Sequence, residues 1–151
     1  MIDTKKRIKQ HEGFSATIYK DSLGYKTLGY GHLVTIKDDF VIGEVYSPEE
    51  LEGVFEEDYS IAEKDGLDII RNQITLEIWE TYSDKQKEIV ESVLIEMCFN
   101  LGKPRVLKFK KFIKALKDKD FKLAEKEMLN SRWAVQVKSR ALMLSKMIGE
   151  L

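Results

Sequence analysis

The chain has 151 residues, of which 43 % are hydrophobic and only two are proline, and this is enough apolar material for the core of one compact domain. Cys98 is the only cysteine, which excludes an internal disulfide and a cysteine-based metal cluster. The formal net charge of −1 conceals 18 acidic against 4 basic residues between positions 38 and 96, and 14 basic against 4 acidic between positions 103 and 148.

The first predicted helix runs from Asp3, a favourable N-cap residue, to His11 or Glu12, with Gly13 as its C-terminal stop. This opening segment is rich in charged residues and has neither the apolar region of a signal peptide nor a membrane span. We therefore expect synthesis in the cytoplasm and no stable association with membranes.

Residues 15–35 change to a strand pattern. Turn signals at Asp21-Ser22-Leu23-Gly24, Gly29 and Gly31 separate short runs of strand-forming side chains. The strand formers are Tyr19, Tyr25, Thr27, Leu28, Tyr30 and Val34. The pattern predicts a small sheet of two or three antiparallel strands.

A helix is predicted to begin at Ser47-Pro48-Glu49-Glu50, which combines an N-cap, a proline at the first helical position and a glutamate that completes a capping box. A longer connecting helix is expected from about residue 59 to residue 80. Gly66 and the mixed segment Asn72-Gln73-Ile74-Thr75 predict a bend or break in it before Trp79.

Ser83-Asp84-Lys85-Gln86 is a second capping box, and the apolar residues that follow at helical spacing predict a core helix ending at Gly102. Cys98 lies in its apolar run and is interpreted as a buried structural thiol. Three further amphipathic helices are predicted over residues 108–116, 121–129 and 137–148. Trp79 and Trp133 are interpreted as packing residues. This order of elements indicates an α+β fold.

Two carboxylates differ strongly in their expected surroundings. Glu12 lies at the C-terminus of the first predicted helix, where the helix dipole and the nearby Phe14 disfavour its ionised form and suit it to be a general acid. Asp21 lies in a turn that offers backbone N–H groups and water, so we expect it to stay ionised as a base or stabiliser. Such a pair is what glycoside hydrolysis requires. The spacing alone is a weak signal in a chain with 26 acidic residues.

The residues around this pair make the signal specific. They contain the pattern Glu-x8-Asp-x5-Thr at Glu12, Asp21 and Thr27, with Gly24-Tyr25, Gly29 and Gly31-His32 in register. This run resembles the catalytic motif of the phage lysozyme family, which includes the T-even phage enzyme. The segments 99–102 and 131–141 resemble two further family signatures, so the resemblance covers most of the chain.

The resemblance implies roles for individual residues. Glu12 would be the acid, Asp21 would activate a water molecule and Thr27 would help to hold that water. His32 and Asp58 would form a partly buried structural ion pair. Roles in lining or approaching the glycan cleft are implied for Leu33, Phe99, Gln136 and Arg140.

The implied fold is lysozyme-like, with a small antiparallel sheet lobe joined by a long helix to a larger helical lobe. The sheet-containing lobe would span about residues 13–58, the connecting helix about 59–80, and the helical lobe about 81–151 together with helix 1–12. The sequence departs from the family pattern at His11, Phe112 and Glu127. The region between Asp58 and Phe99 is also several residues longer than in the T-even enzyme.

The implied function is that of an endolysin, a monomer that cuts the β-1,4 bond between N-acetylmuramic acid and N-acetylglucosamine in peptidoglycan with inversion and without metal or cofactor. It would stay in the host cytoplasm until a pore-forming holin opens the way to the periplasm and the cell wall. No nucleic-acid partner is expected. The alternative is a non-catalytic helical protein whose basic half binds cell wall or nucleic acid. The charged blocks are equally consistent with solvated helix faces.

Overall fold

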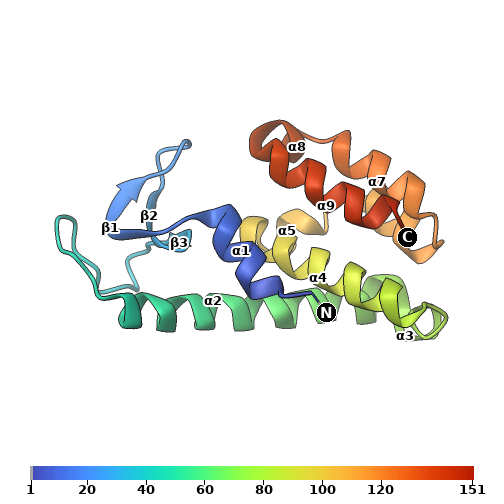
Figure 1. Ribbon diagram of the computed structural model, residues 1–151, viewed down its shortest axis with the longest axis horizontal. Coiled ribbons are helices and arrows are strands. Elements are labelled where there is room, and N and C mark those ends of the chain that lie inside the picture. Colours follow the sequence, from blue (N-terminus) through green and yellow to red (C-terminus); the bar gives the residue numbers. More distant parts are fainter. Residues whose placement is uncertain (1) are drawn as a thin grey trace. The chain divides into compact units, whose positions relative to one another are not determined.

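The computed structural model describes residues 2–151, which form two compact units. The sheet unit comprises residues 3–61, and the helical unit comprises residue 2 with residues 62–151. Helix α2 (Pro48–Ile69) contributes to both units (Figure 1). Within residues 2–151, no helix combines the length and the apolar character that crossing a membrane requires.

The sheet unit begins with helix α1 (Thr4–Glu12). The Asp3 side chain caps this helix by accepting a hydrogen bond of 3.0 Å from the Lys6 amide. Gly13 ends it with a φ of 73°, and its N–H donates to the carbonyl of Lys9. Both ends therefore confirm the predicted helix, and both are fixed by the residue types that the sequence provides.

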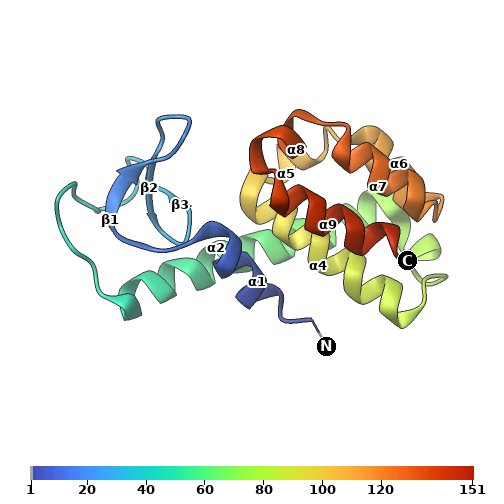
Figure 2. The same ribbon diagram turned by 45° about the horizontal axis from the view of Figure 1, so that its top comes forward.

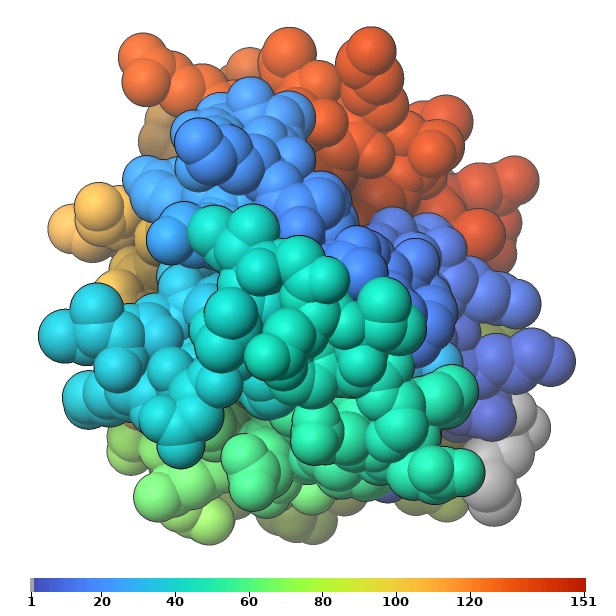
Figure 3. All heavy atoms as spheres, turned by 90° about the vertical axis from the view of Figure 1, so that its left-hand side faces the viewer, coloured from blue at the N-terminus to red at the C-terminus, as the bar shows by residue number. Residues whose placement is uncertain are grey.

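Three strands follow, β1 (Ser15–Lys20), β2 (Lys26–Gly29) and β3 (His32–Leu33), and they form one antiparallel sheet in that order. Tyr19 lies opposite Thr27 in the β1–β2 pair, and Thr27 lies opposite Leu33 in the β2–β3 pair. Residues 34–47 then lead to α2, and the Tyr46 amide bonds to the carbonyl of Ala16 on β1. Figure 3 faces the sheet unit and shows this segment in cyan to teal as part of its surface.

Helix α1 belongs to the sheet unit, whereas the sequence assigned residues 1–12 to the helical lobe. Lysines on α1 reach carboxylates on α2: Lys5 Nζ lies 2.8 Å from Glu56 Oε2, and Lys9 Nζ lies 2.7 Å from Glu52 Oε1. Ile8 of α1 is fully buried. These contacts follow from tertiary packing and have no local signature in the sequence.

Helix α2 begins where the Ser47 hydroxyl accepts the Glu50 amide, as predicted, and continues without interruption to Ile69. The sequence predicted a new helical stretch from about residue 59, but nothing in the structure separates the two parts. The break before Trp79 is present, as the π-helical turn η1 (Ile70–Thr75) and the short helix α3 (Leu76–Trp79). Thr75 at the end of η1 has a φ of 78°.

The helical unit is centred on α4 (Asp84–Leu101), which starts at the predicted capping box of Ser83 and Gln86 and ends at Gly102. Its buried face includes Val90, Val93, Leu94 and Met97, all fully inaccessible to solvent. Burying each large apolar side chain contributes about 1.5–3 kcal/mol, so these residues of α4 contribute substantially to the stability of this unit.

Five helices complete the helical unit: α5 (Lys103–Val106), α6 (Lys110–Lys117), α7 (Phe121–Leu129), α8 (Arg132–Val137) and α9 (Ser139–Gly149). Helix α9 packs against α4, α7 and α8 (Figure 2). The sequence predicted one helix over 137–148 and neither α5 nor α8. Lys138, with a φ of 46°, separates α8 from α9, and a lysine gives no stop signal.

Candidate active site

The turn between β1 and β2 holds Asp21 by its own side chain. Oδ1 of Asp21 accepts hydrogen bonds of 2.9 Å from the amides of Leu23 and Tyr25. The Asp21 amide in turn donates to the carbonyl of Tyr25. One carboxylate oxygen therefore fixes the turn, while Oδ2 accepts no hydrogen bond from residues 2–151 and can bond to water.

Glu12 is the last residue of α1, and its carboxyl group lies directly against the turn between β2 and β3. A Cβ atom on Gly31 would lie only 2.9 Å from the carboxyl carbon of Glu12 and 3.0 Å from Oε1. Gly31 also has a φ of 73°, which favours glycine. The absence of a side chain at Gly31 therefore leaves the space that Glu12 occupies.

Tyr19 relates these two carboxylates to one another. Burial of its phenol is the largest cause of a raised pKa, and the negative charges of Glu12 and then Asp21 raise it further. Both carboxyl groups thus act electrostatically on one side chain of β1. The sequence marked Tyr19 only as a strand former, although its position two residues before Asp21 places it in the motif.

Thr27 lies beside this group because it faces Tyr19 across the β1–β2 pair. It is only 5 % exposed, and its hydroxyl donates a 3.0 Å hydrogen bond to the carbonyl of Tyr25. Leu33 is the partner of Thr27 on β3 and leaves 52 % of its surface exposed. Within the sheet unit, two carboxylates, a hydroxyl and an exposed apolar side chain therefore belong to one local arrangement suited to acid–base chemistry on a partly apolar substrate.

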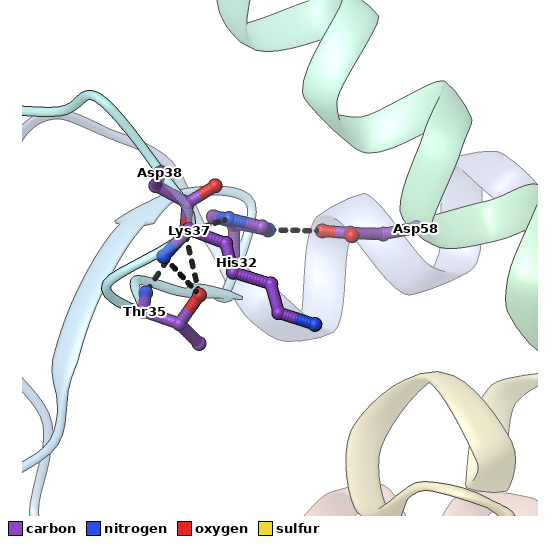
Figure 4. Close-up of polar contacts among 5 residues, drawn as sticks. All are labelled: His32, Thr35, Lys37, Asp38 and Asp58. Atoms are coloured by element: carbon purple, nitrogen blue, oxygen red, sulfur yellow. Dashed lines mark hydrogen bonds and ion pairs between the residues drawn. The ribbon is translucent and has the colours of Figure 1, made fainter.

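His32 on β3 contacts the carboxylate of Asp58 on α2, as the sequence predicted, with Nδ1 2.8 Å from Oδ2. Its Nε2 lies 3.2 Å from Oδ2 of Asp38, a partner that the sequence analysis missed (Figure 4). The Thr35 amide donates to the same Asp38 oxygen at 2.8 Å. The spacing Thr35-Ile36-Lys37-Asp38 was the available signal, because a side chain that closes a turn by bonding to a nearby amide is typical of aspartate.

The contacts of His32 with Asp58 and Asp38 raise the pKa of its imidazole. The hydrogen bond to Asp58 is the largest cause of the raised pKa of His32; burial opposes it, and Asp38 adds to it. Burial alone would raise the pKa of Asp38, but the Thr35 amide and His32 together lower it. Both ring nitrogens can donate only in the imidazolium form, so the two carboxylates favour a charged His32.

The predicted residues of the helical unit have different surroundings. Arg140 is 6 % exposed, and its Nε donates a 2.7 Å hydrogen bond to Oε2 of Glu96, which is fully buried. The sequence did not predict a role for Glu96. Phe99 is partly buried, whereas Gln136 is exposed and borders a pocket. The roles of these three residues in substrate binding stay predictions.

The packing residues behave as the sequence predicted. Trp79 is 9 % exposed and Trp133 is 3 % exposed, so neither offers a sugar-stacking face. The indole N–H of Trp133 donates to Oδ1 of Asn100 at 2.7 Å. Burial raises the pKa of the Cys98 thiol to about 12, which makes it an inert core residue.

Comparisons with known proteins agree with this arrangement. A sequence model of the phage lysozyme family matches residues 9–145. The chain is 31 % identical over 156 residues to two proteins of Dictyostelium discoideum, probable T4-type lysozyme 1 and probable T4-type lysozyme 2, covering 91 % of this chain and 88 % of each relative. It is also 27 % identical over 156 residues to the pre-baseplate central spike protein Gp5 of Enterobacteria phage T4, covering 93 % of this chain and 26 % of that protein. The family match includes Glu12, Asp21 and Thr27.

Proposed function

The chain belongs to the phage lysozyme family, and from that premise we propose that it hydrolyses the β-1,4 bond between N-acetylmuramic acid and N-acetylglucosamine in bacterial peptidoglycan. The observation that carries this proposal is the local geometry of the sheet unit. The Glu12 carboxyl group lies against Gly31, Asp21 uses only Oδ1 to hold the hairpin turn, and Thr27 lies opposite Tyr19 on the neighbouring strand. The charges of Glu12 and Asp21 both raise the pKa of Tyr19, after burial of its phenol.

In the proposed reaction, Glu12 gives its proton to the glycosidic oxygen as the bond from that oxygen to the anomeric carbon breaks. A water molecule attacks the anomeric carbon from the opposite face and gives a proton to Asp21. The Thr27 hydroxyl uses its hydrogen toward the Tyr25 carbonyl, so its oxygen has lone pairs with which to accept a hydrogen bond from that water. The products are two shorter glycans, with Asp21 protonated and Glu12 ionised until solvent exchange resets them.

Mass spectrometry of released muropeptides tests the reaction directly. Digestion of purified peptidoglycan should give new reducing ends on N-acetylmuramic acid. The Glu12→Gln variant should lose this activity while remaining folded, because the amide keeps the shape but has no acidic proton. Glu57→Gln is the matched control, since Glu57 is an exposed carboxylate of the same unit. Release of muropeptides by Glu12→Gln at more than a few per cent of the wild-type rate would remove Glu12 from the mechanism.

The stereochemical course separates a water-activating Asp21 from a nucleophilic one. Inversion would give α-configured reducing ends first, as expected for carboxyl groups roughly 6.5–9.5 Å apart with water between them. Proton NMR of the earliest products, before mutarotation, should therefore detect the α-anomer. An initial β-anomer would mean that Asp21 attacks the sugar and that Thr27 has another role.

Host lysis, action as a monomer and passage to the wall through a pore-forming partner belong to the same proposal and are supported by the family resemblance. Co-expression of the protein with a membrane-permeabilising partner in a bacterial host tests how it reaches the wall. Lysis should require both the protein and a membrane-permeabilising partner, and it should fail with Glu12→Gln. Lysis by the protein alone would contradict the need for such a partner.

A further inference from the structure

The three strands of the sheet unit place Tyr19, Thr27 and Leu33 in one row. Tyr19 lies opposite Thr27 in the β1–β2 pair, and Thr27 lies opposite Leu33 in the β2–β3 pair. Directly opposed residues of antiparallel strands project from the same face of a sheet. The other face carries the opposed pair of Leu28, which is fully buried, and His32, which bonds to a carboxylate of α2. The row therefore lies on the face of the sheet that is not directed at α2.

This row has a low centre and two raised sides. Thr27 is only 5 % exposed, whereas Tyr19 is 41 % exposed and Leu33 is 52 % exposed. Neighbouring strands of a sheet lie about 4.8 Å apart, so the two flanking side chains rise from backbones that are separated by roughly 10 Å. This separation leaves room for one sugar ring above the Thr27 side chain.

The strand β1 is irregular immediately before Tyr19. The register between β1 and β2 shifts between Ser15 and Tyr19, as it does at a β-bulge. The Ser15 hydroxyl donates to the carbonyl of Thr17 at 2.6 Å and thereby holds the irregular stretch. Bulges beside active sites change the direction of a side chain that follows. Regular pairing is therefore interrupted at the point where β1 presents Tyr19 beside Thr27.

The hydroxyl group of Tyr19 makes no hydrogen bond with residues 2–151. By contrast, the hydroxyl group of Tyr46 in the same unit accepts a hydrogen bond of 2.6 Å from the Val41 amide. Burial of the phenol and the negative charges of Glu12 and Asp21 raise the pKa of Tyr19, so this group keeps its proton. A protonated phenol that has no protein partner can donate a hydrogen bond to a ligand.

We propose that Tyr19 binds the substrate: its ring and the Leu33 side chain enclose one N-acetylhexosamine unit, and its hydroxyl donates a hydrogen bond to an oxygen of that unit. An aromatic ring contacts the apolar C–H face of a sugar, while the hydroxyl provides the polar contact. The proposal rests on the wall-degrading function inferred above. Because Thr27 is proposed to hold the attacking water, the unit above it is the one whose anomeric carbon is attacked, N-acetylmuramic acid.

The variant Tyr19→Phe separates this role from a structural one. It keeps the ring and removes only the hydroxyl, which has no partner within residues 2–151. The variant should therefore unfold at the same temperature and urea concentration as the wild type. A loss of stability with unchanged substrate binding would assign the hydroxyl to the fold and overturn the proposal.

Steady-state hydrolysis of soluble, uncross-linked peptidoglycan strands measures the contact. Tyr19→Phe should raise KM about fivefold, as expected for the loss of one hydrogen bond, and should change kcat less than about twofold. Tyr30→Phe is the matched control, because it removes a hydroxyl that also makes no hydrogen bond with residues 2–151, from a ring that packs against Phe14 and Phe55. It should change KM less than about twofold. Equal KM values for Tyr19→Phe and the wild type would overturn the proposal.

Binding to the inactive Glu12→Gln protein separates contact with the substrate from an effect on the acid. Calorimetry with the same strands should show about fivefold weaker binding when Tyr19→Phe is added to Glu12→Gln. If Tyr19 acted only by adjusting the pKa of Glu12, binding would be unchanged and the pH profile of kcat would shift instead. That result would overturn the proposal.

The wild-type protein in the same assays tests the proposed reaction separately. A wild type that binds the strands but releases no muropeptides would remove the enzymatic function, and weaker binding by Tyr19→Phe would then still support the contact. Undiminished binding by Tyr19→Phe would overturn the contact whether or not the wild type is active. A wild type that neither binds nor cleaves the strands would overturn both proposals.

Discussion

Gly31 shows how one residue can be required by the side chain of another. The sequence predicts that it is a turn residue, and its φ of 73° confirms this. The close approach of the Glu12 carboxyl group is a second requirement that only the folded chain reveals. A methyl group in this place would meet the group on which the proposed acid catalysis depends.

We therefore expect Gly31→Ala to reduce muropeptide release by about a hundredfold, since small displacements of a catalytic group have effects of this size. Gly43→Ala is the control, because Gly43 has a φ of 92° but no atom within 4 Å of an added Cβ. Both variants should lose about 1 kcal/mol of unfolding free energy through backbone strain. Similar activities in the two variants would show that the Glu12 contact is unimportant.

His32 and its two carboxylates predict a defined pH window for stability. The raised folded pKa of His32 means that its contribution is complete below the unfolded value of 6.5 and is lost as the pH rises through the folded value. The lowered folded pKa of Asp38 means that its contribution is present above the unfolded value of 3.8 and is lost as the pH falls through the folded value.

The stability difference between the wild type and His32→Asn should therefore be largest between these two unfolded values and shrink on either side. Hydrogen bonds to charged groups suggest a maximum of about 1.5–3 kcal/mol. Urea unfolding at a series of pH values measures it. The control Asp38→Asn should retain the Asp58 contact and lose part of the effect, while a difference that does not vary with pH would exclude a charged His32.

At the scale of elements, helix α2 contains two glycines that do different things. Gly53 is exposed, and a Cβ atom there would meet nothing within 4 Å. Gly66 is buried, and a Cβ atom there would lie 3.1 Å from Cγ1 of Ile95 and 3.4 Å from its amide nitrogen. Gly53 therefore only lowers the helix propensity of α2, whereas Gly66 permits α2 to pack closely against α4.

Gly53→Ala should consequently raise the free energy of unfolding by about 1 kcal/mol, the difference in helix propensity between the two residues. Gly66→Ala gains the same propensity but must displace α4, so we expect a net loss of about 1–3 kcal/mol. Thermal or urea unfolding of both variants measures the difference. Equal stabilisation by the two substitutions would show that α2 and α4 do not approach closely at Gly66.

The start of a helix was predictable from the sequence where a capping residue marks it, and was not predictable where no such residue is present. Asp3, Ser47 and Ser83 begin helices as expected, because a short polar side chain can bond to the exposed amides of a first turn. The separation of α8 from α9 at Lys138 has no such signal. Neither does α5, whose four residues are too few to show a hydrophobic period.

At the scale of the whole molecule, the proposed site was predictable where it is local in sequence. Glu12, Asp21, Thr27 and Leu33 belong to one short helix and the hairpin strands that follow it, so local geometry brings them together. Glu96 was missed because nothing in the sequence distinguishes it among 26 acidic residues, and the turn signal at Asp38 does not reveal that the turn lies beside His32. Their importance comes from the histidine and the arginine that packing places beside them.

The uneven charge distribution predicts a salt dependence of wall hydrolysis that is opposite to the one expected from the net charge. A protein of charge −1 should act faster on an anionic wall as added salt screens the repulsion. Five cations of the helical unit gather around one pocket and predict the opposite, namely Arg105, Lys108, Lys110, Lys111 and Arg132. Wall hydrolysis should slow as ionic strength rises from 0.01 to 0.15 M, over which the Debye length falls from about 30 to about 8 Å. A rate on walls that rises with salt would mean that net charge governs the encounter.

Selection can act on Asp21 for two separate reasons, the structure of the hairpin turn and the proposed reaction. One oxygen of its carboxylate holds the turn, and the other is available to the reaction. Asparagine can form the same turn with its amide oxygen but is a far weaker base. A descendant of this chain that stopped cutting glycans would therefore lose the carboxylate but keep the turn. Among such descendants we expect asparagine at this position more often than any aliphatic residue, because the hairpin turn still requires a side-chain oxygen that accepts its amides.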